Sequence, residues 1–150
     1  MKQRSRTAPR TVRKESTEAR PAAKPRQGPS KDAQRLALLA AEAALDKKAA
    51  EVEIVDVTGK VDYADFLVLT TGHSDRHVAA IAEAVDEALG KKGWNSISVE
   101  GLPRGEWVLL DFVDVVVHVF QERTRALYDL DGLWMDARRV RLPDSSSGSA

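Results

Sequence analysis

GEWVLLDFVDVVVHVFQ, residues 105–121, is the stretch of this chain that decides the fold. It contains two runs rich in β-branched, aromatic and leucine residues, Trp107–Leu110 and Val115–Phe120, and such runs are typical of strands. Asp111-Phe112-Val113-Asp114 joins the two runs, so the pattern predicts a β-hairpin. The run Val115–Val117 is apolar at consecutive positions, which face opposite sides of a sheet. We therefore expect the second run to be a central strand that is covered on both faces.

Outward from the hairpin, the chain alternates between helical and strand patterns. Ser30 is suited to cap a helix that begins near Lys31 and ends near Lys47. Ser74 is suited to cap a second helix, which ends before Gly93. The other expected elements are strands at residues 52–58, 66–71 and 97–99 and a helix at residues 122–131. The order α-β-β-α-β-β-β-α predicts an α/β fold, a mixed β-sheet of about five strands with helices packed on it.

Length and composition favour one soluble cytoplasmic domain. The chain has 150 residues and no cysteine, so disulfides and thiolate metal sites are excluded. No apolar run approaches the roughly 20 residues of a membrane helix, and no secretory segment follows Met1. We expect a disordered basic extension at residues 1–30, a folded domain at 31–142 and a disordered tail at 143–150.

The net charge of zero hides an asymmetry between the N-terminal extension and the rest of the chain. Residues 1–31 contain ten Lys/Arg and two Glu, so they carry +8 and the remainder carries −8. An acidic domain is expected to bind a basic protein, while the extension can add a weak, non-specific contact with RNA. The arginine-rich composition is also typical of an organelle transit peptide, but this extension lacks the apolar helix face of one.

The turn Gly72-His73-Ser74-Asp75 lies where a strand meets a helix, a place that can hold a phosphate. One alternative function is therefore a nucleotidyltransferase-like enzyme or a nucleotide-binding protein that uses this turn. A magnesium site would need a second carboxylate two residues after Asp75, where the chain has His77. His73 and His77 have a spacing that can bind zinc, but no third ligand follows. We favour the simpler interpretation, in which Ser74 and Asp75 cap the helix and no metal is bound.

Three polar residues interrupt the apolar hairpin: Asp111, Asp114 and His118. A histidine beside a carboxylate can act as an acid–base pair, yet no nucleophile or phosphate loop accompanies these residues. We therefore predict a structural or interface role, with no catalytic residue and no cofactor. Among the aromatic residues, Trp107 is the one we expect at a protein interface.

Three motifs resemble the signatures of the ribosomal silencing factor family, also called Iojap-like, and they follow in that family's order. The first is Asp62–Asp65 with Thr71–Ala82, the second is Trp107–Phe120, and the third is Arg125–Leu130 with Leu133-Trp134. Together they cover about residues 33–137. The resemblance implies a fold like that of nucleotidyltransferases without their metal-binding carboxylates, and a protein that is not an enzyme.

The resemblance also implies a function in translation. Members of this family bind the large ribosomal subunit through ribosomal protein fourteen. They block joining of the small subunit and lower translation when nutrients are short, and free members are often homodimers. With the ribosome as partner, the RNA that the basic extension could contact weakly would be ribosomal RNA. By resemblance, the expected partner-binding residues are Trp107, Leu110, Asp111, Asp114 and His118 in the hairpin, with Asp75, Arg76 and Tyr128 as weaker candidates.

One residue departs from the family pattern. The family often has glycine in the hairpin connection where this chain has Val113. Glycine adopts a positive φ readily, whereas a β-branched residue does so at a cost. Either the turn type differs here, or Asp111 and Asp114 are presented differently.

Overall fold

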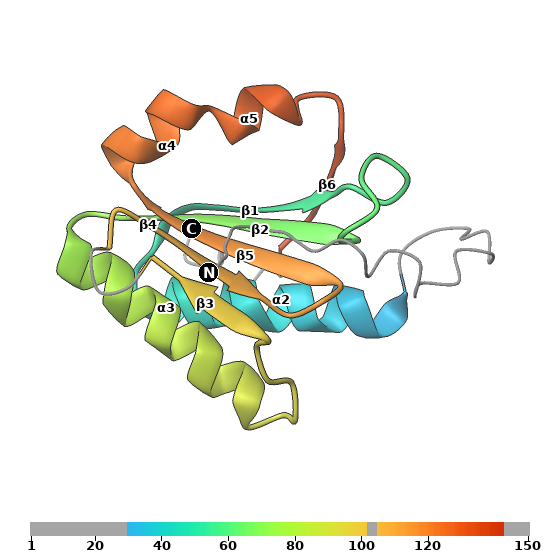
Figure 1. Ribbon diagram of the computed structural model, residues 1–150, viewed down its shortest axis with the longest axis horizontal. Helices are drawn as coiled ribbons and strands as arrows, with labels where there is room; N and C mark the ends of the chain where they lie inside the picture. Colours follow the sequence, from blue (N-terminus) through green and yellow to red (C-terminus); the bar gives the residue numbers. More distant parts are fainter. Residues whose placement is uncertain (1–29, 102–104, 143–150) are drawn as a thin grey trace, which may run out of the picture.

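The structure is a computed structural model that describes residues 30–101 and 105–142. The extension and tail predicted at residues 1–30 and 143–150 lie outside these ranges, except for Ser30. Within the described residues the chain forms one sheet with helices on both faces (Figure 1). The predicted α/β fold with a mixed sheet is thus confirmed.

The sheet has six strands in the order β3-β4-β5-β2-β1-β6. Their bounds are β1 Ala50–Asp56, β2 Phe66–Gly72, β3 Ser98–Glu100, β4 Trp107–Asp111, β5 Val115–Gln121 and β6 Arg138–Val140. The pair β2–β5 is parallel and every other neighbouring pair is antiparallel. The sequence predicted about five strands, and β6 is the additional one.

Strand β5 occupies the centre of the sheet, as its run of valines predicts. It pairs with β4 on one side and with β2 on the other. Every residue from Val115 to Phe120 is buried. Strand β2 is buried along its whole length as well, so the two parallel strands form the middle of the hydrophobic core.

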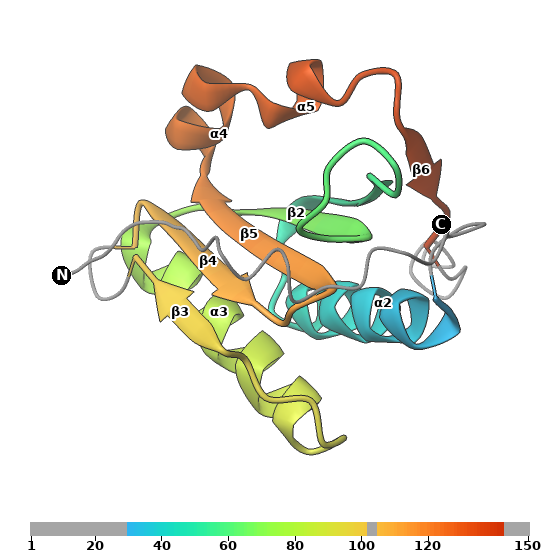
Figure 2. The same cartoon turned by 45° about the vertical axis from the view of Figure 1, so that its right-hand side comes forward.

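Two long helices cover one face of the sheet (Figure 2). α2 spans Lys31–Asp46 and is capped by the Oγ of Ser30, which accepts a hydrogen bond from the backbone N–H of Ala33. α3 spans Asp75–Gly90, and the Oγ of Ser74 accepts from the N–H of His77. Both N-caps are the serines that the sequence predicts, because a short hydroxyl side chain can bind the free N–H groups of the first turn.

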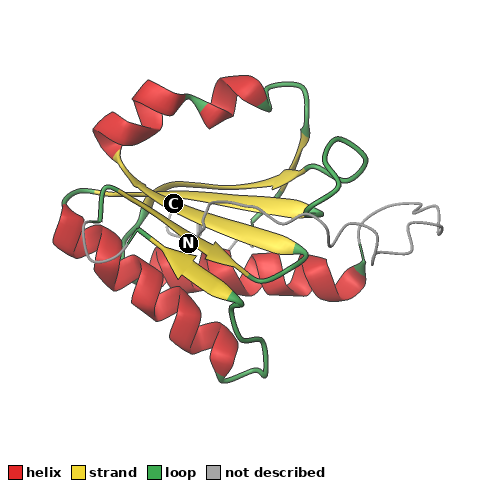
Figure 3. Cartoon of the chain, in the orientation of Figure 1, coloured by secondary structure: helices red, strands yellow, loops and turns green. Residues whose placement is uncertain are grey.

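The opposite face of the sheet lies under two short helices, α4 (Glu122–Tyr128) and α5 (Leu130–Leu133) (Figures 1 and 3). We call residues 122–133 the arch. The sequence predicted one helix over residues 122–131, and this is wrong at Asp129, whose left-handed backbone (φ +48°) ends α4. The side chain of Asp129 then caps α5 by accepting from the N–H of Gly132. No helix in the described ranges is long and apolar enough to cross a membrane.

Candidate protein-interaction site

The alternation of β4 divides its residues between the two faces of the sheet. Val108 and Leu110 are fully buried in the core beneath α2 and α3. Trp107 and Leu109 are partly buried on the other face, the one under the arch. Asp111 shares that face by the period of two.

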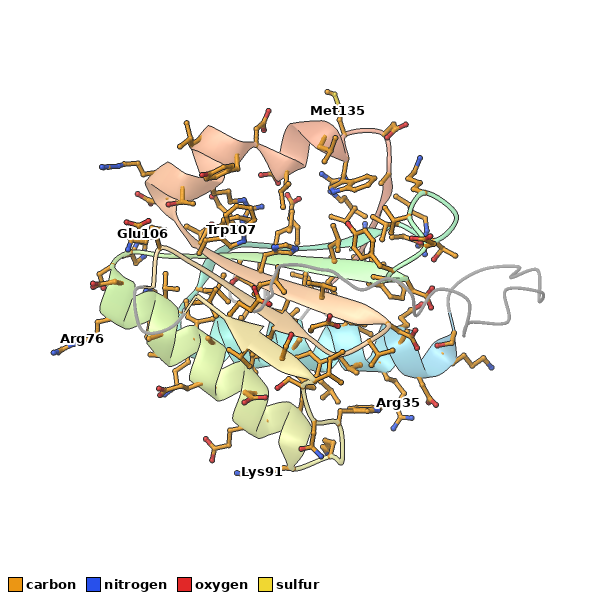
Figure 4. All side chains as sticks on the ribbon, viewed as in Figure 1. Arg35, Arg76, Lys91, Glu106, Trp107 and Met135 are labelled. Atoms are coloured by element: carbon orange, nitrogen blue, oxygen red, sulfur yellow. The ribbon has the colours of Figure 1, made fainter. Side chains whose placement is uncertain are left out.

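Four aromatic rings meet under the C-terminal end of α4, and we call them the aromatic cluster: Trp107, His118, Phe120 and Tyr128. The ring centre of Trp107 lies 4.8 Å from that of Tyr128 and 5.0 Å from that of Phe120. His118 stacks on Phe120 at 5.7 Å with only 7° between the ring planes. Tyr128 is 55% exposed, so the cluster reaches the surface there. Figure 4 shows Trp107 on the strand beneath the arch, beside Glu106.

His118 fixes the indole of Trp107 by a hydrogen bond. The Nε1–H of Trp107 donates to Nδ1 of His118 at 3.1 Å. Burial, together with the positive charge of Arg125, lowers the pKa of His118 to about 4. His118 is therefore neutral at pH 7, and Nδ1 keeps the lone pair that accepts from the indole. The predicted interface role thus becomes one of orienting Trp107, since the His118 ring is itself 7% exposed.

Asp111 and Asp114 lie at the other end of the hairpin from Trp107. Four residues of extended strand place Asp111 about 13 Å along β4 from Trp107. Oδ1 of Asp111 accepts from the N–H of Val113 at 2.8 Å. The backbone carbonyl of Asp114 accepts from the N–H groups of Asp65 and Phe66. Both aspartates therefore shape the turn and its attachment to β2.

Val113 adopts the backbone conformation that glycine favours. Its φ is +79°, and the N–H of Asp114 donates to the carbonyl of Phe112 at 3.0 Å across it. This is a γ-turn of the rare form with a positive central φ, which is strained for a β-branched residue. Val113 is thus held in a turn that glycine would adopt without this strain.

The structure divides seven of the eight predicted partner-binding residues into three sets and places the eighth, Leu110, in the core. Trp107, His118 and Tyr128 belong to the aromatic cluster. Asp75 and Arg76 are exposed in the first turn of α3, against the loop that leads into β4: a Cβ on Gly105 would lie 2.7 Å from the carbonyl oxygen of Asp75. Figure 4 shows Arg76 pointing away from the sheet at this end.

Asp111 and Asp114 form the distant set, and Leu110 belongs to neither surface. The Leu110 side chain is fully buried beneath α2 and α3, so it cannot touch a partner that docks on this conformation. Leu110 is therefore a core residue and not the partner contact that was expected. The physical reason is the alternation of β4, which turns Leu110 away from the face that carries Trp107.

The Gly72–Asp75 turn is occupied by the protein's own hydrogen bonds. Ser74 caps α3, as predicted. Nδ1 of His77 accepts from the N–H of His73 at 2.9 Å, and Nε2 lies 2.7 Å from the carbonyl of Lys47. Nδ1 of His77 therefore ties the turn to α3, and Nε2 ties α3 to the C-cap of α2. Across residues 30–101 and 105–142, no three His, Cys, Asp or Glu side chains stand where they could share a metal ion.

Comparison with known proteins gives the family. The model of the family described as "Ribosomal silencing factor during starvation" matches residues 30–150. The chain belongs to the ribosomal silencing factor family.

Individual relatives agree with this assignment. A ribosomal silencing factor RsfS from Halalkalibacterium halodurans is 40% identical over 109 residues, which are 73% of this chain and 93% of that protein. The chloroplastic protein Iojap of Zea mays is 31% identical over 103 residues, 69% of this chain and 45% of that longer protein. The crystal structure of a Chromobacterium violaceum protein matches with a TM-score of 0.67 and 36% identity, over 68% of this chain and 85% of that one. The name of the Halalkalibacterium halodurans relative describes a silencing factor.

In this member of the silencing factor family, three apolar side chains of the arch and its exit were missing from the predicted surface. Leu127 is 75% exposed, Leu133 63% and Met135 70%. Figure 4 shows Met135 pointing away from the sheet. No signal in the sequence indicated this exposure, because Leu127, Leu130, Leu133 and Trp134 recur at a helical spacing that predicts one covered face. In the structure the helix ends at Asp129, so the residues on either side of the break do not form that single face.

Proposed function

We propose that the protein lowers translation by binding the large ribosomal subunit through ribosomal protein fourteen and blocking the small subunit, under nutrient limitation and in the cytoplasm. Family membership supports a role in silencing. The observation that carries the docking part of the proposal is the exposed aromatic and apolar surface around Trp107 and Tyr128. Aromatic residues that are partly exposed and rigidly held are the usual anchors of protein interfaces.

The proposed docking surface runs from the aromatic cluster onto the arch. It includes Trp107 and Tyr128 as anchors, with Leu127 beside them on α4. Asp75 and Arg76 stand at its edge on α3. The residues from 32 to the C-terminus carry a net charge of −8, so a basic protein is the complementary partner and its approach is accelerated.

The two hairpin aspartates, Asp111 and Asp114, extend the surface only if the partner also reaches the far end of the hairpin. A partner that contacts Trp107 must extend about 13 Å along β4 to reach Asp111. Standard protein interfaces of about 800 Å² per partner are wide enough for this. Asp111 and Asp114 are thus expected at the rim, where charges affect the association rate more than the lifetime of the complex.

Steric exclusion is the proposed mechanism. No covalent bond is made or broken, and no cofactor takes part. The bound domain needs only to occupy volume that the small subunit would fill. A homodimer of the free protein that buried the same surface would have to dissociate before it could dock.

The test is co-sedimentation of the purified full-length protein with purified large ribosomal subunits. Tyr128→Ala is expected to lower the affinity at least about tenfold, the loss of a typical interface anchor. Tyr63→Ala is a matched control, because Tyr63 is also 55% exposed but lies in the loop between β1 and β2. Trp107→Ala should act in the same direction as Tyr128→Ala.

The second readout is subunit joining. Adding the wild-type protein to a mixture of large and small subunits should reduce the fraction of joined ribosomes, and Tyr128→Ala should restore it. Sedimentation with small subunits alone, or normal joining at saturating protein, would contradict the proposal. Equal affinities for Tyr128→Ala and Tyr63→Ala would move the docking surface away from the aromatic cluster.

A further inference from the structure

Arg125 is the only lysine or arginine that is buried in the described part of the chain; 6% of it is exposed. A buried guanidinium is costly unless its donors are all paired in good geometry. It is also the only buried residue of α4, and α5 has none. The arch therefore attaches to the sheet through this buried side chain together with partly buried packing such as that of Leu130.

The guanidinium first joins the two helices of the arch. Its Nε donates to Oδ2 of Asp131 at 2.9 Å, and its Nη2 donates to Oδ1 at 2.8 Å. This two-point pairing matches the planar fork of arginine and fixes orientation as well as distance. The hydrogen bonds from Arg125 lower the pKa of Asp131, as expected for a carboxylate held in its charged form. The pair spans the break at Asp129, so it sets the angle between α4 and α5.

The remaining nitrogen joins the arch to the sheet. Nη1 donates to the carbonyl of Glu51 in β1 at 2.5 Å and to Oγ1 of Thr71 in β2 at 2.9 Å. Glu51 has a left-handed backbone with φ +49°, at the register irregularity between Ala50 and Glu53. A bulge takes a carbonyl out of the ladder and leaves it free for another donor. The strained backbone of Glu51 thus places its carbonyl where it accepts the hydrogen bond from Arg125.

Arg125 is linked to the aromatic cluster in two ways. Tyr128 follows it by three residues, about one helical turn, on the same side of α4. The position of Arg125 therefore fixes where the ring of Tyr128 meets Trp107. Its charge, second to burial, also lowers the pKa of His118, which keeps Nδ1 available to the indole of Trp107.

We propose that Arg125 is a positioning residue for partner docking: its guanidinium ties α4 and α5 to β1 and β2 and so holds Tyr128 against Trp107. Arg125 touches no partner itself. The claim that this arrangement serves docking rests on the function proposed above, whereas the claim that Arg125 sets the arrangement does not.

The experiment uses the full-length chain with Trp94→Phe and Trp134→Phe, which leaves Trp107 as the only one of the three tryptophans. In this background Arg125→Met removes the guanidinium but keeps most of the apolar stem. The emission of Trp107 is expected to move to longer wavelength, because its ring loses Tyr128 and meets water. Large-subunit affinity, measured by co-sedimentation in the native-tryptophan background, is expected to fall about tenfold, as for Tyr128→Ala.

Arg138→Met is the matched control. Arg138 also pairs with an aspartate at 2.8 Å, but its partner is Asp56 and its side chain is 60% exposed at the edge strand β6. Arg138→Met should leave the Trp107 emission and the affinity unchanged. Arg125→Lys separates charge from geometry: one ammonium group cannot replace a fork that serves three partners, so Lys should not restore the wild-type emission.

Milder variants decide the matter if Arg125→Met does not fold. Asp131→Asn removes the charged partner in α5, and Thr71→Val removes the hydroxyl in β2 without a change of size. Each should shift the Trp107 emission part of the way. Wild-type emission in both variants, or in a folded Arg125→Met, would overturn the positioning role.

The two proposals fail separately. If Trp107→Ala and Tyr128→Ala bind large subunits normally, the docking surface is wrong, while the emission of Arg125→Met still tests the positioning role. If those two variants lose binding and folded Arg125→Met keeps wild-type affinity, Arg125 does not position the docking surface and the docking proposal stands.

Discussion

Val113 places a β-branched side chain on a backbone conformation that favours glycine. Its φ of +79° costs about 1–3 kcal/mol for a residue other than glycine. The side chain is 47% exposed and contributes little to the core. Phe112 and Val115 close the turn through a 2.9 Å hydrogen bond, so the strain is held in place by the strands on either side.

Val113→Gly should therefore stabilise the protein. We expect a gain of about 1 kcal/mol in the free energy of unfolding, after the extra entropy of glycine in the unfolded chain is deducted. Urea denaturation of both proteins measures it. Val99→Gly is the control, because Val99 is 38% exposed in β3 and is not among the described residues with positive φ. That variant should lose stability, and a loss in Val113→Gly as well would show that the turn is not strained.

His118 makes stability depend on pH. Its pKa is about 4 in the folded protein, through burial and then Arg125, against about 6.5 in an unfolded chain. Between these values only the unfolded state gains the proton, so stability is highest above pH 6.5 and falls as the pH drops toward 4. At pH 5 this residue should lower the free energy of unfolding by about 2 kcal/mol relative to pH 7.

His118→Gln provides the comparison for that prediction. A glutamine carbonyl can accept from the indole of Trp107 but does not titrate. The unfolding free energy of the variant, measured in urea at pH 7 and pH 5, should change less than that of the wild type by about 2 kcal/mol. His73 and His77 are present in both proteins and cancel in the difference. Parallel pH profiles would refute a neutral buried His118.

The backbone path of the arch depends more than that of any other described element on contacts between neighbouring residues. Asp129 is both the C-cap of α4 and the N-cap of α5. A Cβ on Gly132 would lie 2.3 Å from Oδ2 of Asp129. Gly132→Ala should therefore cost about 1–3 kcal/mol of stability, since the capping carboxylate must move.

Gly90→Ala is the counterpart for Gly132→Ala. Gly90 ends α3, and its added Cβ would meet its nearest atom at an ordinary 3.6 Å. Alanine there should be neutral or should stabilise by up to about 1 kcal/mol. Thermal unfolding of the two variants compares them. Equal effects would mean that the arch does not depend on the cap at Asp129.

Elements whose apolar residues recur at a regular spacing were predictable from the sequence, whereas the short polar strand β6 was not. The valines of β5 and the serine caps of α2 and α3 stand as the sequence predicts. β6 has only three residues, two of them arginines; it pairs with β1 in a short antiparallel ladder, beside the ion pairs of Arg138 with Asp56 and Arg139 with Glu53. Such long-range pairing leaves no local periodicity, so the sequence pattern could not indicate this strand.

At the scale of the whole molecule, opposite charges separate along the sequence. Residues 1–29 contain nine Lys/Arg and two Glu. Deleting them should reduce large-subunit affinity at low salt by less than about tenfold and should weaken its dependence on salt. Co-sedimentation at two salt concentrations measures both effects. Complete loss of binding would instead place the main contact in the extension.

The partner surface was only partly predictable from the sequence. The hairpin motif contained Trp107, Leu110 and Asp111 side by side, but a strand turns neighbours to opposite faces and carries others far apart. Alternation alone was enough to separate Leu110 from Trp107. The meeting of Trp107 with Tyr128 was not predictable, because it depends on the break at Asp129 and on the contacts of Arg125 across 54 and 74 residues of sequence.

The parallel pairing of β2 with β5 affects how the chain is made. β2 leaves the ribosome about 50 residues before β5 is complete, which at usual synthesis rates is a delay of roughly 2 to 10 seconds. During that time its seven apolar-rich residues have one unpaired edge, a site prone to pairing with other chains. A chain halted before Val115 can never close this edge. Nascent chains of this protein should therefore need chaperone protection until the hairpin emerges, and prematurely truncated ones should be removed by proteolysis.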